Sequence, residues 1–426
     1  MEKEPKTTEQ SSAFLRGVEL AAKAHEKVIA KTPLQRNAFL SNRYDANIYL
    51  KREDLTPVRS YKIRGAFNFF RKAILSDEKQ QQFVCASAGN HAQGFAFACQ
   101  HFGVKGVIFM PVTTPQQKIA KTRVFGGENV EIKIFGDFFD QCNKEAMRFA
   151  EETGASLVPP FDHADIIEGQ ASVGLEILAD IDKPVDMLIL PVGGGGLAAG
   201  VSRVMAELSP HTELKFIQPA GAPGFKESLL KGERVTLSRV NSFVDGAAVG
   251  QMGALNFEML KGYSADDVLL VSEDHVCETI IEMLNVEGIV LEPAGALEID
   301  ALRWMPAEEL RGKTIVCIAS GGNFDFERLP EVKERALKAA GLKKYYLIRM
   351  PQRPGALREL LDILGPDDDI ARFEYLKKSA RNFGTILVGI ESKTASNFDL
   401  IQLELEKTGY QFEDITNDEV LASFIV

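Results

Sequence analysis

The sequence of 426 residues lacks any long unbroken apolar run, which argues against a helix that spans a bilayer. Its beginning, MEKEPKTTEQSS, is polar and partly acidic, unlike a secretory signal or a transit peptide, and it predicts a flexible tail. We therefore expect a cytoplasmic protein with no membrane partner.

Cysteine is scarce, and the five cysteines form an odd set without paired spacing. This argues against the disulfide framework of a secreted protein and favours reduced thiols. No cluster of potential ligands surrounds any of them in the sequence, so we expect no metal site. They are Cys85, Cys99, Cys142, Cys277 and Cys317.

Positive charge is also in deficit, with 49 Lys and Arg against 60 Asp and Glu and a net charge of −11. Nucleic acids and anionic membranes are bound through positive surfaces, so we expect neither as a partner. The composition, 45% hydrophobic and 26% charged, is typical of a globular protein. A small molecule is the better hypothesis for a ligand.

What the sequence does contain, from about residue 12 to 330, is an alternation of short apolar runs with helical stretches. Strand and helix in alternation predict an α/β fold with a mostly parallel sheet covered on both faces. Sites in such sheets lie at the carboxyl ends of strands, where these runs meet Gly or Pro. The runs are FVCASAG (83–89), GVIFMP (106–111), DMLILPVG (186–193), LKFIQPAG (214–221) and TIVCIASGG (314–322).

The pattern changes after residue 330, and a length of 426 residues already suggests two or three domains. Residues 331–344 are charged and helix-favouring and predict a helical neck. Residues 345–426 follow with strand, helix, strand, strand, helix, strand, the order of a ferredoxin-like module. This module contains no cluster of nucleophiles and bases, so we expect a sensing or assembly role, with a purely structural appendage as the alternative.

Four consecutive glycines, 193–196, stand between an apolar strand and an uninterrupted helix. Glycines allow several backbone N–H groups to converge on an anion at a helix start, so the run predicts a phosphate cradle. It matches neither the dinucleotide G-x-G-x-x-G pattern nor the Walker loop. A plain glycine-rich turn is the alternative.

Lys62, in SYKIRGA (60–66), stands among apolar neighbours and two positions from Arg64. A surface lysine with a buried stem is one interpretation. The other is an amine whose charged form is disfavoured by burial and by like charge, and which can attack a carbonyl. Arg64 has its own alternative, in which it points away and pairs with an acid on the helix surface.

Two further turns follow predicted strands. SAGNHAQG (87–94) opens a helix whose backbone donors suit a carboxylate, and Asn90 offers a donor and an acceptor to a ring hydroxyl, although it could simply cap the helix. SGGN (320–323) places the neutral hydroxyl of Ser320 at the end of a strand. The candidate substrate contacts in the first turn are Ser87, Ala88, Gly89 and His91.

Together, SYKIRGA, SAGNHAQG, PVGGGGLAAG, EPAGA (292–296) and SGGN resemble the motif set of the fold type II pyridoxal phosphate enzymes, and most of all biosynthetic threonine dehydratase. The resemblance extends from about residue 12 to the end of the chain. It implies two open, mostly parallel sheets in a catalytic domain at 1–330, with a small subdomain at roughly 54–155. It also implies that residues 345–426 are an ACT-like regulatory domain.

The resemblance gives each motif a role toward pyridoxal 5'-phosphate. Lys62 would be the Schiff-base lysine, Asn90 the partner of the ring 3-hydroxyl, and Ser320 the partner of the pyridine nitrogen. The phosphate loop would comprise Gly193, Gly194, Gly195, Gly196 and Leu197.

The implied reaction converts L-threonine to 2-oxobutanoate and ammonia, the first step of isoleucine biosynthesis. Lys62 would remove the α-proton, and the cofactor phosphate would protonate the leaving hydroxyl. Because the hydroxyl of Ser320 holds a pyridinium proton less well than an aspartate would, prompt β-elimination is favoured over transamination. One methyl group changes discrimination by only about 1–3 kcal/mol, so L-serine is a second candidate substrate.

Related activities are the alternatives. Serine racemase shares most motifs but has a proton-donating serine where this chain has Ala88, and its acidic cation ligands correspond to Gln218 and Gly224. We therefore expect neither racemisation nor a metal. A catalytically inactive pyridoxal-phosphate-binding protein and a catabolic dehydratase are further alternatives, the latter weakened by the C-terminal module. The resemblance also implies a homotetramer inhibited by isoleucine, with valine opposing it.

Overall fold

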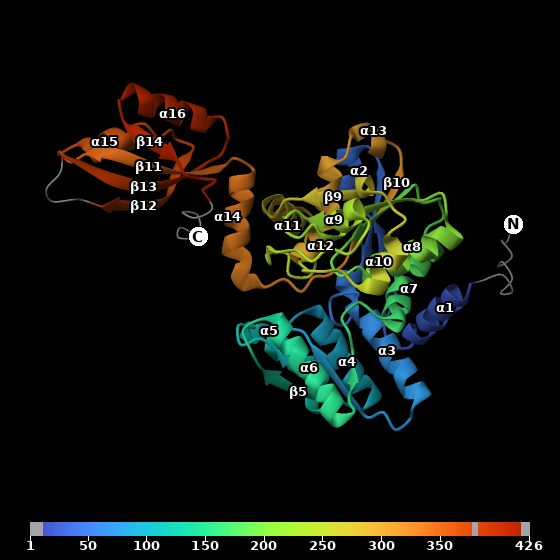
Figure 1. Ribbon diagram of the computed structural model, residues 1–426. Helices are drawn as coiled ribbons and strands as arrows, with labels where there is room; N and C mark the ends of the chain where they lie inside the picture. Colours follow the sequence, from blue (N-terminus) through green and yellow to red (C-terminus); the bar gives the residue numbers. More distant parts are fainter. Residues whose placement is uncertain (1–11, 377–381, 419–426) are drawn as a thin grey trace. The chain divides into compact units, whose positions relative to one another are not determined.

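A computed structural model describes residues 12–376 and 382–418 (Figure 1). Residues 1–11, in which we predict a flexible tail, lie outside the described residues. The chain folds into two compact units. The first contains the chain up to Glu273 together with Glu287–Phe324, and the second contains Asp274–Val286 and Asp325–Val426.

The larger sheet of the first unit has the strand order β1-β2-β10-β7-β8-β9. β1 pairs antiparallel with β2, and the other neighbours pair in parallel, as the alternating pattern predicts. β7 and β10 are buried along their whole length, which explains their continuous apolar sequences. The strands are β1 (Leu34–Arg36), β2 (Asn47–Arg52), β7 (Met187–Pro191), β8 (Glu213–Pro219), β9 (Val268–Val271) and β10 (Thr314–Ala319).

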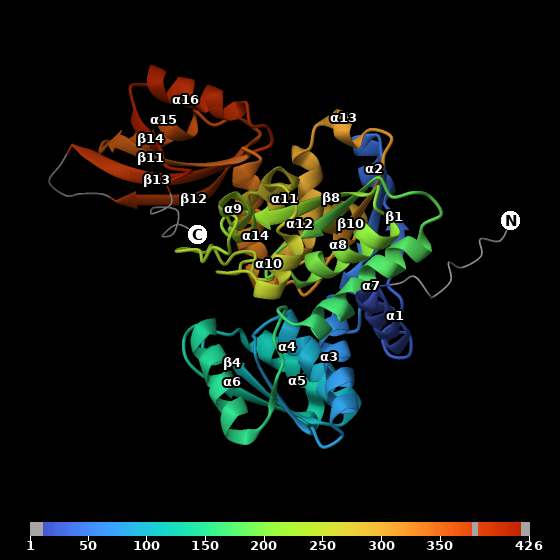
Figure 2. The same ribbon diagram turned by 45° about the vertical axis from the view of Figure 1, so that its right-hand side comes forward.

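Helices cover both faces of this sheet, as Figure 2 shows. Leu188 and Leu190 of β7 pack into a core with Ala198 and Val201 of α8. On the other face, the thiol of Cys317 lies against the backbone of α12. The helices of this part are α1 (Ala13–His25), α2 (Ala38–Tyr44), α7 (Ala164–Asp180), α8 (Gly196–Leu208), α9 (Gly224–Lys231), α10 (Ala254–Leu260), α12 (Pro293–Ala301) and α13 (Ala307–Leu310).

A smaller parallel sheet in the same unit has the order β5-β4-β3-β6. Alternate residues of β3 face opposite cores: Phe83 and Cys85 pack with α4, whereas Val84 and Ala86 pack with α6. The strands are β3 (Gln82–Ala86), β4 (Lys105–Met110), β5 (Val130–Ile134) and β6 (Ser156–Leu157). The helices are α3 (Lys62–Ser76), α4 (Asn90–Phe102), α5 (Gln116–Gly126) and α6 (Phe139–Thr153).

The second unit contains an antiparallel sheet with the order β12-β13-β11-β14. Tyr346, Ile348 and Val388 share its core with Phe398 and Ile401 of α16. The predicted order of strand, helix, strand, strand, helix, strand is confirmed. The elements are α11 (Glu273–Glu287), α14 (Leu329–Ala339), β11 (Lys343–Pro351), α15 (Ala356–Leu361), β12 (Asp368–Leu376), β13 (Phe383–Ser392), α16 (Asn397–Lys407) and β14 (Gln411–Asp414).

Two global features bear on the expectations from composition. Within the ranges that the structure describes, no helix combines the length and apolar character needed to cross a membrane. The cysteines are all buried and unpaired, so the prediction of free thiols is confirmed for the described part of the chain.

Candidate active site

Lys62 is the first residue of α3, and its surroundings connect it to the SGGN turn. The neighbouring Tyr61 donates a backbone hydrogen bond to the carbonyl oxygen of Ser320 at 3.2 Å. The Lys62 amine, Nζ, donates to the carbonyl oxygen of Pro160 at 3.0 Å. The fold thus brings together two motifs that are more than 250 residues apart in the sequence.

The amine of Lys62 has an unusual ionisation. Burial lowers its pKa to about 8, and the Glu292 carboxylate opposes that shift. Nζ lies 5.4 Å from the ring centre of Tyr61 and 5.9 Å from that of Phe161. The expected effect of burial is confirmed, but the expected effect of like charge is not, because Arg64 does not face the amine.

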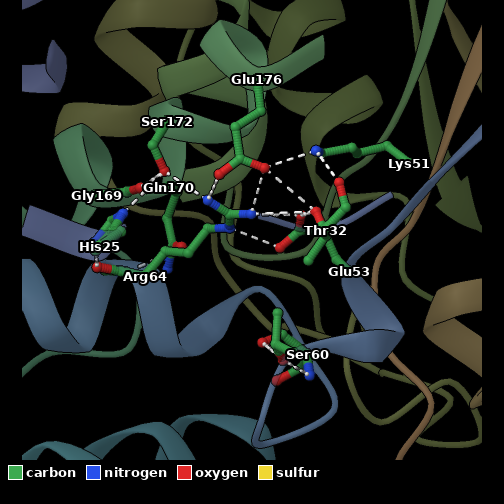
Figure 3. Close-up of polar contacts among 12 residues, drawn as sticks. His25, Thr32, Lys51, Glu53, Ser60, Arg64, Gly169, Gln170, Ser172 and Glu176 are labelled. Carbon is green, nitrogen blue, oxygen red and sulfur yellow. Dashed lines mark hydrogen bonds and ion pairs between the residues drawn. The ribbon is translucent and has the colours of Figure 1, made fainter. Parts of the chain in front are cut away.

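Arg64 follows Lys62 by two residues, a rotation of about 200° on an α-helix, so the two side chains leave opposite sides of α3. Figure 3 shows its guanidinium between two carboxylates. Nε and Nη2 donate to Glu53 at 2.7 and 2.9 Å, and Nη1 and Nη2 donate to Glu176 at 2.7 and 2.9 Å. Arg64 does point away and pair with acids, as the alternative interpretation has it, but the predicted surface location is wrong, because its side chain is fully buried.

Lys51 and Thr32 extend this network, as Figure 3 also shows. Lys51 Nζ donates to Glu176 at 2.6 Å, and the Thr32 hydroxyl donates to Glu53 at 2.6 Å. Two cations therefore balance two carboxylates, which is the condition for burying such charges. We call Thr32, Lys51, Glu53, Arg64 and Glu176 the Arg64 cluster. It ties the start of α3 to β2, α7 and the 3-10 turn η1 (Glu53–Leu55).

The glycine run 193–196 forms the turn from β7 into α8. Gly195 has a φ of +94°, a left-handed conformation that favours glycine. A Cβ atom on Gly194 would lie 2.2 Å from the ring of Phe161, and one on Gly193 would lie 2.9 Å from the Cα of Ala247. The glycines are therefore required by close approach of the chain itself, before any ligand is considered.

The orientation of this turn suits an anion. The carbonyl oxygen of Gly194 accepts from Asn256 Nδ2 at 2.7 Å and from the Gly253 amide at 3.1 Å. Because C=O and N–H point in opposite directions in a trans peptide, the Gly195 N–H points away from these donors. The first N–H groups of α8 also have no acceptor within the helix, and a helix start favours negative charge.

The asparagine turn, 87–90, is partly exposed and leads from β3 into α4. The hydroxyl oxygen of Ser87 accepts from the backbone N–H of Gly89 at 3.2 Å and of Ala92 at 3.3 Å. Ala88 lies between Ser87 and Gly89 in the sequence, and its side chain carries no polar group. The Ser87 hydroxyl thus holds the turn, and it engages two of the amides at the start of α4.

Close packing of α4 on α3 places this turn near Lys62. A Cβ atom on Gly94 would lie 3.1 Å from the backbone nitrogen of Ile63, the residue after Lys62. His91 is buried beneath the turn, with Nε2 3.0 Å from the carbonyl oxygen of Val158. Burial lowers the pKa of His91 to about 3, with a further contribution from Lys62, so the ring is neutral.

Glu292 belongs to the candidate site, although the sequence analysis assigned no role to this first residue of EPAGA. It is buried and accepts a hydrogen bond from Asn90 Nδ2 at 2.6 Å. Burial raises its pKa to about 7, and Asp245 adds to the shift. A Cβ atom on Gly321 would lie 2.0 Å from its Oε1, so the glycine of the SGGN turn makes room for this carboxyl group.

Asn323, the last residue of SGGN, was also missed. Its Nδ2 donates to Asn90 Oδ1 at 2.6 Å and to the carbonyl oxygen of Val58 at 2.9 Å. Its Oδ1 accepts from Lys121 Nζ at 2.5 Å. The oxygen of the Asn90 amide is therefore occupied, and we expect Asn90 to offer a ligand only a donor, not the donor and acceptor that the sequence suggested.

Ser320 lies at the carboxyl end of β10, buried, and its hydroxyl donates to the carbonyl oxygen of Ala294 at 3.1 Å. A neutral hydroxyl thus occupies the predicted position. The donor set fits pyridoxal 5'-phosphate, since the fold combines an amine of lowered pKa, an anion cradle and neutral groups for a ring.

Gln218 occupies one position at which a cation ligand was considered. Its Nε2 donates to the carbonyl oxygens of Val192 at 3.4 Å and Ala222 at 3.2 Å. Its Oε1 accepts from the amides of Phe225 and Lys226, each at 3.0 Å. The amide nitrogen therefore supplies positive polarity to carbonyl oxygens that could otherwise face a cation.

Comparison with known protein families gives two matches. Residues 25–321 match the family of pyridoxal-phosphate dependent enzymes. Residues 334–425 match the C-terminal regulatory domain of threonine dehydratase.

Individual relatives agree. The chain is 44% identical over 408 residues to the biosynthetic L-threonine dehydratase of Halalkalibacterium halodurans, covering 96% of this chain and 98% of the relative. It is 45% identical over 408 residues to that of Bacillus subtilis, covering 95% and 96%. Among solved structures, the processed threonine deaminase isoform 2 from Solanum lycopersicum is similar, with a TM-score of 0.71, 37% identity, and coverage of 78% of this chain and 96% of that one.

Proposed function

Since the chain belongs to the pyridoxal-phosphate-dependent enzymes, and among them to the biosynthetic L-threonine dehydratases, we propose that it converts L-threonine to 2-oxobutanoate and ammonia. The hydroxyl group is eliminated from the β-carbon, and the released enamine is hydrolysed. The product is the entry to isoleucine biosynthesis. The observation that carries the proposal is the buried amine of Lys62 beside the SGGN turn and near the asparagine turn.

Pyridoxal 5'-phosphate, when bound, supplies a conjugated ring that withdraws electrons from the substrate α-carbon. The residues that would hold it are Lys62 at the aldehyde, the backbone of 193–197 at the phosphate, Asn90 at the ring oxygen and Ser320 at the ring nitrogen. Support comes from the left-handed Gly195 and from the first N–H groups of α8, which have no acceptor within the helix.

Lys62 is the base of the proposed reaction. With a pKa of about 8, roughly a tenth of its amine is neutral at pH 7, compared with well under a thousandth for an ordinary lysine. A neutral amine can take the α-proton of the substrate, which a charged amine cannot. The carbonyl of Pro160, 3.0 Å from Nζ, can hold one of its protons and orient it.

Asn90 and Ser320 would set the electronic state of the ring. Asn90 donates one amide N–H to Glu292, and its oxygen is occupied by Asn323, which leaves one N–H for the ring oxygen. A donor at that oxygen favours its anionic form. Ser320 offers a neutral hydroxyl, which favours elimination over transamination.

The substrate contacts remain proposals as well. The turn of Ser87, Ala88 and Gly89 would bind the substrate carboxylate at the start of α4. The Ala88 amide and the Ser87 hydroxyl would be its donors, because the Ser87 amide already donates to Phe109 and the Gly89 amide to Ser87 Oγ. The side chain of Ala88 has no proton to give to the opposite face of the substrate, which disfavours racemisation. His91 would contribute to substrate binding from below the turn, since its Nε2 contacts the Val158 carbonyl oxygen and its ring is neutral.

We further propose that isoleucine inhibits the enzyme through the C-terminal regulatory domain and that valine opposes it. The support is the match of residues 334–425 to the regulatory domain of threonine dehydratase. L-Serine is a second proposed substrate, and a cytoplasmic homotetramer is the proposed assembly. We propose no divalent metal at Gln218, because its amide already donates to two carbonyl oxygens.

A direct assay tests the proposal. Purified protein should be yellow, and added threonine should release a 2-oxo acid that a hydrazine reagent detects. A Lys62→Ala variant should release none. Yellow wild-type protein without product from threonine or serine would support an inactive binding protein instead, and product from serine alone would make it a serine dehydratase.

A further inference from the structure

A row of polar side chains leads from α5 to the candidate cofactor site. Lys121 Nζ donates to Asn323 Oδ1 at 2.5 Å, and Asn323 Nδ2 donates to Asn90 Oδ1 at 2.6 Å. Asn90 Nδ2 then donates to Glu292 Oε1 at 2.6 Å. We call Lys121, Asn323, Asn90 and Glu292 the amide relay.

The two ends of the amide relay give it a direction. An ammonium group can only donate, so the oxygen of Asn323 must face Lys121. The nitrogen of Asn323 must then face Asn90, which turns the oxygen of Asn90 toward Asn323 and its nitrogen toward Glu292. At the far end Glu292 Oε1 accepts from Asn90 Nδ2, so every contact runs from donor to acceptor.

The direction of each amide has to be set by its contacts, because the oxygen and nitrogen of an asparagine side chain are nearly the same size and can exchange by a flip. Asn323 has one more fixed contact, the donation to the carbonyl oxygen of Val58 at 2.9 Å. Two contacts therefore set the same orientation of Asn323, because its nitrogen donates to Val58 and its oxygen accepts from Lys121.

Lys121 lies at the outer end of the relay, partly buried on α5. Its Nζ donates to Asn323, which in turn donates to Asn90, and its charge also favours the ionised form of Glu292. Asn323 itself is adjacent to the glycines of the SGGN turn. The two residues are placed to act on Asn90, not on a ligand.

We propose that Lys121 and Asn323 are positioning residues that hold the amide of Asn90 with its N–H groups toward Glu292 and the cofactor ring. The proposal rests on the cofactor assignment made above. Without the relay, Asn90 could turn its oxygen toward the ring oxygen, which replaces a hydrogen bond by a repulsion between two acceptors.

The test uses full-length holoprotein in four variants, with the absorption spectrum of the bound cofactor read at one fixed pH without substrate. Lys121→Met removes the donor at the outer end, and Lys121→Arg keeps one. Asn323→Asp keeps the acceptor for Lys121 but removes the donor to Asn90. Lys105→Met is the matched control, since this exposed lysine donates only to the backbone of Glu128.

We expect Lys121→Met and Asn323→Asp to shift the visible absorption maximum, and Lys121→Arg and Lys105→Met to leave it unchanged. With threonine, Lys121→Met should lower kcat about tenfold with little change in KM, the effect of one misdirected hydrogen bond. Lys121→Arg should restore most of this loss.

Two results would overturn the proposal. One is a spectrum and kcat for Lys121→Met that equal those of Lys105→Met. The other is equal impairment of Lys121→Met and Lys121→Arg together with a lower melting temperature, which would assign Lys121 a structural role only. If wild-type protein binds the cofactor but does not turn over threonine, the proposed function fails while the spectra still decide the relay.

Discussion

Lys62 owes its lowered pKa to where its amine lies. Two aromatic rings and the Pro160 carbonyl surround Nζ, and the loss of water contact makes the charged form expensive. Arg64 contributes nothing to this, because it leaves the opposite side of the helix. The same short motif therefore contains a lysine tuned by burial and an arginine neutralised by carboxylates.

The lowered pKa of Lys62 predicts how fast cofactor-free protein captures pyridoxal 5'-phosphate as pH changes. Only the neutral amine attacks the aldehyde, so the rate should rise from pH 6.5, bend near pH 8 and level off above it. Stopped-flow absorbance would measure this. The control is Nα-acetyl-lysine, whose side-chain amine is free and whose rate should still rise toward pH 10. A protein rate that rises with pH in the same way would contradict the lowered pKa of Lys62.

Sequence motifs indicated Lys62, Asn90 and Ser320, because a lysine, an amide and a hydroxyl at strand ends have recognisable neighbours. They gave no role to Glu292 or Asn323. These residues contact Asn90 across 202 and 233 positions of the sequence, and nothing local distinguishes them from a capping glutamate or a turn asparagine. Only the folded contacts show that both are site residues.

At the scale of elements, the Arg64 cluster fixes the beginning of α3. Burying four charges is costly, and the cost is offset only while every partner is present. Arg64 donates to Glu53 and Glu176 through all three of its guanidinium nitrogens. Because Lys62 lies in the same helical turn, the cluster also limits how far the Lys62 amine can move.

Arg64→Met should therefore destabilise the protein by about 3–5 kcal/mol, since it leaves Glu53 buried without its partner. The midpoint of chemical denaturation, compared with that of the unchanged protein, would measure this loss of stability. The matched control is Arg148→Met, which removes the two ion pairs of an exposed arginine on α6 and should leave the midpoint unchanged. Equal midpoints for both variants would show that the cluster contributes no stability.

Gly194 gives a second prediction for an element, the turn from β7 into α8. A Cβ at this position would lie 2.2 Å from the Phe161 ring, so Gly194→Ala must displace the turn or the ring. We expect at least a tenfold weaker affinity for pyridoxal 5'-phosphate, measured by equilibrium dialysis of cofactor-free protein. Gly262→Ala, in open space, is the control and should bind normally; equal affinities would argue against the phosphate assignment.

The sequence predicted strands well where they are buried on both faces, as in β7 and β10, because apolar runs that end at Gly are a strong signal. It gave no indication of β1 or β6. These strands, Leu34–Arg36 and Ser156–Leu157, are too short to show a period, and their pairing depends on neighbours elsewhere in the chain.

At the scale of the whole molecule, length and the change of pattern near residue 330 were enough to suggest separate domains. They could not show that residues 274–286 group with the C-terminal part. That grouping depends on tertiary contact, including the ion pair of 2.7 Å between Asp274 of α11 and Arg335 of α14. A local sequence pattern contains no information about which distant helix α11 will meet.

This contact determines where the chain should be cut to separate activity from regulation. A chain that ends at Leu329 loses Arg335, the partner of Asp274, together with all of α14 after its first residue. A chain that ends at Gly341 retains all of α14 and removes β11 and everything after it. We expect the shorter chain to melt at a lower temperature than the longer one.

The chain ending at Gly341 should turn over threonine but no longer respond to isoleucine. Inhibition requires isoleucine to bind two states of the protein unequally, and the truncation removes the domain proposed to make that distinction. Steady-state rates with and without isoleucine, compared with the full-length protein, would measure the response. Isoleucine could also compete with threonine at the active site. Inhibition that survives the truncation and is relieved by high threonine would place isoleucine at the active site. The C-terminal domain would then have no role in this inhibition.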